Sequence, residues 1–79
     1  MNKLILKERT QEYVVYLYRP EGRGSYGEIR MNIGDERAFI VSRSDEDTAT
    51  GRYAFKATRA VEECVQEQKF PLEFTQAWC

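Results

Sequence analysis

The sequence predicts a two-layer α+β domain in which one amphipathic helix packs on one face of a mainly antiparallel sheet. Residues 53–68 place their apolar side chains with the 3.6-residue period of a helix. Residues 28–33 alternate apolar and polar side chains with the two-residue period of a half-buried strand. The connections between the strands are short, which is typical of an antiparallel meander. With 79 residues, the chain is expected to form one domain, 1–79, around one small core.

The first strands are expected at residues 4–6 and 13–18. β-branched and aromatic residues dominate residues 13–18, and both faces of this segment are apolar, which is typical of a central strand. Residues 7–12 are polar and contain neither glycine nor proline. The sequence therefore leaves open whether residues 3–18 form one bent strand or two.

The next strands follow a reversal of the chain. Proline and glycine in residues 19–25 break the strand pattern. Residues 28–33 then direct Ile29, Met31 and Ile33 towards the core, and residues 38–41 form the third strand of a meander. Residues 72–78 alternate again and form a C-terminal strand. With residues 3–18 counted as one strand, the predicted order is β-β-β-α-β.

The helix is expected to begin between residues 45 and 51. Residues 44–48 offer several N-cap side chains, Thr48 among them, and place acidic charge at the positive end of the helix dipole. Gly51 favours the later start. The helix must end by residue 69 or 70, because Pro71 disfavours the α conformation in the residue before it.

Composition argues against several classes of protein. The net charge is -1, and the 12 basic and 13 acidic residues are interspersed, so the basic surplus of a nucleic-acid binder is missing. No apolar run approaches the roughly 18 residues of a membrane span or forms a signal peptide, so we expect a cytoplasmic protein with no membrane partner. The absence of histidine removes the commonest general base, and we expect no enzyme and no catalytic residue.

Residues 22–27, Gly-Arg-Gly-Ser-Tyr-Gly, match the dinucleotide-binding pattern G-x-G-x-x-G. That pattern requires a helix to begin within the glycines, whereas residues 28–33 have a strand period. Together with Glu28 and Ile29, the segment resembles the glycine-rich loop of protein kinases, which joins two antiparallel strands. The strand at residues 38–41 lacks lysine, and no His-Arg-Asp or Asp-Phe-Gly sequence occurs. We therefore expect a hairpin loop and no cofactor.

The remaining groups that could bind a metal or react are the acidic run at residues 45–47 and the two cysteines. The carboxylates could bind Mg²⁺ or Ca²⁺, but capping of the helix accounts for them without a metal, and no metal site is expected. Cys64 lies on the apolar stripe of the helix and Cys79 is the last residue. Their spacing matches no metal or redox motif, so both are predicted to be thiols.

The aromatic residues indicate an interaction surface. Five Tyr, four Phe and one Trp exceed what one helix can cover, and exposed Tyr and Arg are enriched at interface centres. The expected surface is the helix-free face of the sheet, with Tyr13 or Tyr16, or an open edge strand. The loop at residues 19–27 lies beside it. The candidate interaction residues are Tyr16, Arg23, Tyr26, Arg30, Arg43 and Phe55.

The favoured function is a non-catalytic protein-interaction module that binds an unknown partner or forms a homodimer. The alternative is nucleic-acid binding: three strands and a helix, with Gly-Glu-Ile-Arg at residues 27–30, resemble the layout of the AP2 and phage-integrase arm-type DNA-binding domains. That resemblance implies a sheet lying in the major groove. Acidic residues interleave with the arginines, so nucleic acid is the less favoured partner. A small enzyme without histidine is the least favoured reading.

Overall fold

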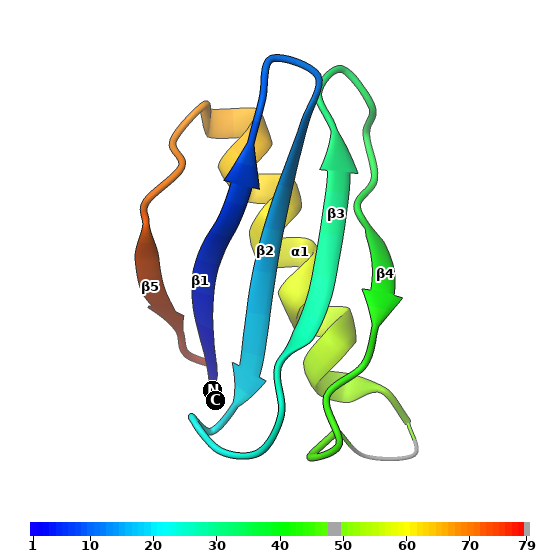
Figure 1. The fold of residues 1–79 in the computed structure, drawn as a ribbon, viewed down its shortest axis with the longest axis vertical. Helices are drawn as coiled ribbons and strands as arrows, with labels where there is room; N and C mark the ends of the chain where they lie inside the picture. Colours follow the sequence, from blue (N-terminus) through cyan, green and yellow to red (C-terminus); the bar gives the residue numbers. More distant parts are fainter. Residues whose placement is uncertain (48–49, 79) are drawn as a thin grey trace.

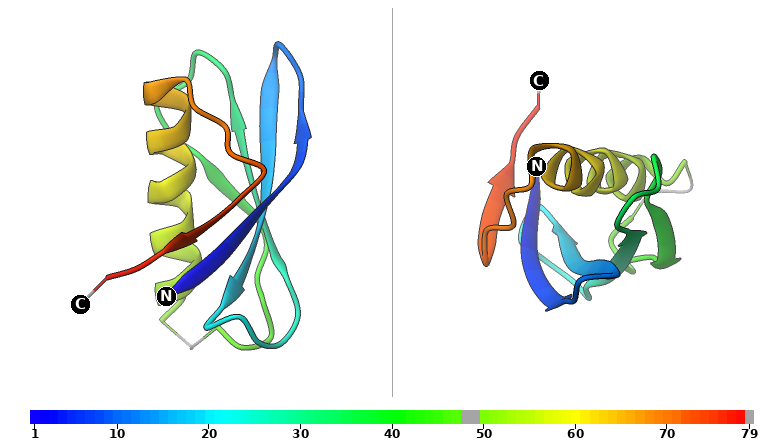
Figure 2. Two further views of the ribbon diagram at one scale, coloured as in Figure 1. Left: turned by 90° about the vertical axis from the view of Figure 1, so that its left-hand side faces the viewer. Right: turned by 90° about the horizontal axis from the view of Figure 1, so that it is seen from above.

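The computed structural model describes residues 1–47 and 50–78 and has two layers. One helix covers one face of a five-stranded antiparallel sheet with the strand order β4-β3-β2-β1-β5 (Figures 1 and 2). The elements in chain order are β1 (Asn2–Arg9), β2 (Tyr13–Pro20), β3 (Gly27–Asn32), β4 (Phe39–Ser42), α1 (Arg52–Glu67) and β5 (Glu73–Gln76). The predicted fold class is confirmed. The order is β-β-β-β-α-β, with one strand more than the sequence predicted.

The additional strand arises because the N-terminal segment forms a hairpin around Thr10. The Thr10 hydroxyl accepts hydrogen bonds from the N–H groups of Glu12 and Tyr13, both at 3.0 Å. The Thr10 N–H donates to the Tyr13 carbonyl at 2.9 Å. A threonine side chain thus supplies the turn that glycine or proline usually supplies, and it separates β1 from β2.

The core lies between the sheet and α1, with β2 as the central strand, as its two apolar faces predicted. Its buried apolar members are Leu4, Val14, Tyr16, Tyr18, Ile29, Met31, Ala54, Ala57, Ala60 and Val61. Small side chains on α1 let the helix approach the larger side chains of the sheet closely. Ile33, expected in the core, is 41% exposed, because β3 ends at Asn32.

α1 begins after Gly51, at the late limit of the predicted range. Gly51 adopts a left-handed conformation and has no side chain to cap the helix. The Asp47 carboxylate caps it instead, accepting hydrogen bonds from the N–H groups of Tyr53 at 3.1 Å and Ala54 at 3.0 Å. The capping interpretation of the acidic run is confirmed for Asp47, whereas Thr48 lies outside the described residues.

The C-terminal end of α1 allows a test of local backbone strain. Gln68 has a φ of 55°, the left-handed region that glycine adopts at lowest cost. Because Gln68 is exposed, Gln68→Gly is expected to raise the free energy of unfolding by about 0.5–1 kcal/mol. Gln66→Gly, inside the helix, is the matched control and should lower it by about 1 kcal/mol. Urea denaturation measures the free energy of unfolding of both variants. An equal decrease in the two variants would show that the left-handed conformation of Gln68 carries no strain.

Candidate interaction surfaces

Tyr16 was predicted to contribute to an interaction surface, and this prediction is wrong. Its side chain is fully buried, its ring lies edge-on to Phe74 with 5.7 Å between centroids, and its hydroxyl donates to the Pro71 carbonyl at 2.7 Å. The register of β2 against β3 places Tyr16 opposite Ile29, on the face that α1 covers. Tyr13, three residues earlier, lies on the helix-free face.

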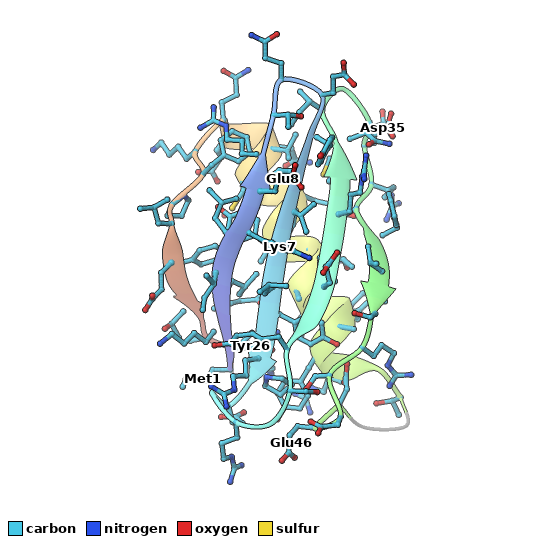
Figure 3. All side chains as sticks on the ribbon, viewed as in Figure 1. Met1, Lys7, Glu8, Tyr26, Asp35 and Glu46 are labelled. Atoms are coloured by element: carbon cyan, nitrogen blue, oxygen red, sulfur yellow. The ribbon has the colours of Figure 1, made fainter. Side chains whose placement is uncertain are left out.

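Two cationic side chains on the helix-free face, Lys7 and Arg30, already have partners within the sheet. Lys7 Nζ lies 2.8 Å from the Glu28 carboxylate, and this contact raises the pKa of Lys7. Lys7 and Glu8 project from this face in Figure 3. The candidate residue Arg30 lies over the Tyr13 ring, with Cζ 3.9 Å from its centroid. Binding phosphate would require such cations to leave their present partners, which weakens the case for nucleic acid on this face.

The glycine-rich segment forms the β2–β3 loop at one end of the sheet. Gly22 and Gly24 have positive φ angles, and a strand rather than a helix begins at Gly27. Ser25 and Asp45 hold the loop reciprocally: the Ser25 N–H donates to the Asp45 carboxylate at 2.8 Å, and the Asp45 N–H donates to the Ser25 hydroxyl at 2.9 Å. The bonds from Ser25 lower the pKa of Asp45. This backbone continues directly into β3, which rules out the dinucleotide fingerprint.

Three predicted interaction residues are exposed near this end of the sheet. Arg23 and Tyr26 belong to the β2–β3 loop, and Arg43 directly follows β4. The Tyr26 ring, 39% exposed, is partly covered by the Arg19 guanidinium 5.0 Å from its centroid. Arg30 lies further along β3, opposite Phe39 of β4, and Tyr16 is buried, so the predicted set does not form one surface.

The edge strand β4 carries the most prominent run of exposed apolar side chains. Phe39, Ile40 and Val41 are 48%, 44% and 50% exposed. Phe39 and Val41 line a shallow groove of about 400 Å³ on the helix-free face, whereas Ile40 lies opposite Ile29 on the helix side. The sequence predicted the strand but not its exposure, because the position of a strand at the edge depends on pairing between distant segments.

Phe55, near the start of α1, is 56% exposed, and the Arg59 guanidinium lies 5.9 Å from the centroid of its ring. Phe55 precedes Glu62 by seven residues, close to two helical turns, so both side chains leave the same side of the helix. The Glu62 carboxylate accepts a hydrogen bond at 3.0 Å from the N–H of Ala38, the residue before β4. In Figure 1 the first turns of α1 lie beside the end of β4. We define the β4 surface as Phe39, Ile40, Val41 and Phe55.

The β4 ladder contains a bulge at Val41. Glu28 of β3 faces Ser42, and the next residue, Ile29, faces Ile40, so Val41 is an additional residue in β4. A bulge disrupts the ladder and twists an edge strand away from pairing with another strand. The β4 surface is therefore better suited to contacts between side chains than to the addition of a strand.

The opposite edge strand, β5, is regular and borders a second groove. β5 pairs with β1 over four consecutive residues. α1 packs mainly on β3, with smaller contacts to β1, β2 and β4, and a groove of about 380 Å³ remains between α1 and β5. Ala60, Cys64 and Phe74 form its apolar floor, and Glu63 and Glu67 lie on the helix side. We call this feature the α1–β5 groove.

Reactive groups are few in the described part of the chain. Cys64 is a free thiol, and its partial burial raises the pKa of the thiol, which disfavours the nucleophilic thiolate. Cys79, also predicted to be a thiol, lies outside the described residues. No three His, Cys, Asp or Glu side chains within residues 1–47 and 50–78 are grouped to hold a metal ion.

Across the described residues, the structure contains no helix with the length and hydropathy needed to cross a membrane. No protein-family model, no curated protein and no solved structure matches the chain.

Proposed function

We propose that the protein is a non-catalytic interaction module that binds another protein chain, either a different partner or a second copy, through the β4 surface. The observation that carries this proposal is the run of three half-exposed apolar side chains on the edge strand β4, together with half-exposed Phe55 in the turns of α1 that lie beside the end of β4. Single exposed apolar residues are common, whereas a cluster that joins a strand and a helix is typical of an interaction site.

The size of the β4 surface favours a weak or transient complex. Covering the exposed half of one large apolar side chain contributes about 1 kcal/mol, so the four together contribute about 4 kcal/mol. Association also costs translational and rotational freedom. The adjacent groove on the helix-free face, which includes Arg30, would add polar contacts at the rim of such an interface.

Nucleic-acid binding is the weaker alternative. The layout that resembles AP2 and phage-integrase arm-type domains has three strands before the helix, whereas four strands precede α1 in this chain. The Lys7–Glu28 ion pair and the stacking of Arg30 on Tyr13 occupy cations that a groove-binding sheet would direct to phosphates.

Capture experiments with charge substitutions test the proposal. Tagged wild-type protein is used to capture chains from a lysate of the source cells, and a second, differently tagged copy reports self-association. Val41→Lys and Phe55→Lys each place a charge on the β4 surface at side chains that are already half exposed. We expect each to abolish capture, because an unpaired cation buried at an interface costs several kcal/mol.

The matched control is Leu72→Lys, which replaces an apolar side chain that is 77% exposed and lies outside the β4 surface. This variant should capture the same chains as the wild type. The proposal is overturned if the wild type captures neither copy nor partner, or if the lysine on the β4 surface and the lysine at position 72 have the same effect.

A further inference from the structure

We infer that the α1–β5 groove binds an extended peptide segment that adds a strand to β5 and carries apolar and basic side chains. β4 and β5 are the two opposite edges of the sheet. The inference therefore rests on different residues from the β4 surface, and either can fail without the other.

Within the part of the chain that the structure describes, no strand pairs with the outer edge of β5. The Leu6 N–H donates to the Leu72 carbonyl at 2.9 Å, and the β1–β5 register, continued by one residue beyond Ile5 and Glu73, places these residues opposite each other. In an antiparallel ladder, the residues between such pairs turn their N–H and C=O groups away from the partner strand. The backbone groups of Glu73 and Thr75 therefore point outward from the sheet, in the arrangement that an added strand requires.

The groove offers apolar contacts to every second side chain of an added strand. Successive side chains of a strand point to opposite faces of the sheet, so alternate residues of the added segment would face the helix side. There they meet the floor of Ala60, Cys64 and Phe74. Ala60 and Cys64 are small, and α1 packs mainly on β3, so space remains between the helix and this edge. An apolar floor beside an open strand is the arrangement used in peptide recognition by strand addition.

The charge of the groove favours a basic segment. Glu63 and Glu67 are one helical turn apart on the helix side of the groove, and neither forms an ion pair with the residues that the structure describes. Lys69 also lines the groove, which leaves one negative charge in excess on this side. A lysine or arginine of the bound segment can lay its aliphatic stem on the floor and direct its charge to the two carboxylates.

Fluorescence anisotropy with synthetic peptides tests this inference. The probe is a fluorescein-labelled peptide, Val-Thr-Arg-Thr-Val-Thr-Arg, in which valine and arginine share one face. The counterpart replaces each arginine with glutamate. At low ionic strength we expect the basic peptide to bind at least tenfold more tightly than the acidic peptide, and to weaken as salt is added. Equal affinity of the two peptides would overturn the inference.

Two further comparisons separate strand addition from non-specific attraction. Methylation of alternate peptide amides removes the donors that would face β5, and it should weaken binding at least tenfold. Thr75→Pro removes an outward N–H without removing a bond to β1, and it should have the same effect if the variant remains folded. The methylated peptide gives the answer even if Thr75→Pro does not fold. Unchanged binding of the methylated peptide would overturn strand addition.

Charge variants locate the peptide on the protein. The double variant Glu63→Gln/Glu67→Gln should reduce the preference for the basic peptide at least fivefold, whereas Glu12→Gln, an exposed acid at the β1–β2 turn, should leave it unchanged. Val41→Lys on the β4 surface should bind the peptide as the wild type does, which distinguishes this site from the β4 surface. An equal effect of the groove variant and the Glu12 variant would overturn the assignment to this groove.

Discussion

Gly27→Ala is expected to destabilise the domain by about 3 kcal/mol. A Cβ atom at Gly27 would overlap the Cε1 and Cζ atoms of the Tyr18 ring and would lie 2.7 Å from its hydroxyl oxygen. The ring has no room to move aside, because Tyr18 is fully buried and its hydroxyl donates to the Asp47 carboxylate at 2.8 Å. The glycine thus makes space for an aromatic side chain on the neighbouring strand.

Urea denaturation compares Gly27→Ala with two controls. Gly22→Ala meets no atom within 4 Å but has a φ of 71°, so it should cost only about 1 kcal/mol of backbone strain. In a Tyr18→Val background the clash is absent, and the added cost of Gly27→Ala should fall below about 1 kcal/mol. The overlap with Tyr18 does not cause the destabilisation if Gly27→Ala lowers the free energy of unfolding no more than Gly22→Ala does. The same conclusion holds if Gly27→Ala costs as much in the Tyr18→Val background as in the wild type.

Asp47→Ala is expected to lower the free energy of unfolding by about 3 kcal/mol. The carboxylate is almost inaccessible, with 1% of the side chain exposed. It accepts hydrogen bonds from the Tyr53 and Ala54 N–H groups and from the Tyr18 hydroxyl. Removing it leaves the buried Tyr18 hydroxyl and the buried Ala54 N–H without this acceptor, and it also removes the negative charge at the helix N-terminus.

Asp47→Asn and Glu46→Ala refine this prediction. The asparagine retains one acceptor oxygen but loses the charge, so its cost should be about 1–2 kcal/mol. Glu46 is exposed, and within the described residues no hydrogen bond or ion pair joins its side chain to the helix N-terminus, so Glu46→Ala should change stability by less than about 0.5 kcal/mol. If Asp47→Ala were no more destabilising than Glu46→Ala, the capping role of Asp47 would be wrong.

The sequence predicted those helices, strands and caps that are determined by residues close to one another in the chain. The period of residues 53–68 predicted α1, and Pro71 marked its limit, because helix periodicity and proline sterics act over a few residues. The alternation at residues 28–33 predicted β3, and the acidic run predicted a cap. The sequence left open whether residues 3–18 form one strand or two, because the hairpin turn is formed by the Thr10 hydroxyl without the usual glycine or proline.

The candidate site depended on contacts between distant segments and was predicted less well. β2 is apolar on both faces, so its own pattern does not show that Tyr16 faces α1 and Tyr13 faces away. The prediction of an open edge strand as an interaction site named no residues, because the order of the strands decides which one is at the edge. Phe55 was predicted as an interaction residue, and its side chain is 56% exposed in the structure.

The two edges of the sheet differ in what they offer to another chain. β4 is bulged and exposes apolar side chains on both faces, whereas β5 is regular and exposes backbone groups beside an apolar groove. Side-chain contacts at β4 and strand addition at β5 use different physical forces and respond to different substitutions. On the two proposals above, each edge of the sheet binds a chain of its own, and the two sites share no residue.

Photo-crosslinking from position 39 tests the central claim most directly. Replacing Phe39 with p-benzoylphenylalanine preserves an aromatic side chain at the β4 surface, and Gln11 at the exposed β1–β2 turn receives the same group as a control. After irradiation in source-cell lysate, we expect a covalent adduct from position 39 and none from position 11, with mass spectrometry identifying a second copy or a partner. No adduct from position 39, or equal adducts from both positions, would contradict the assignment of the β4 surface as the interaction site.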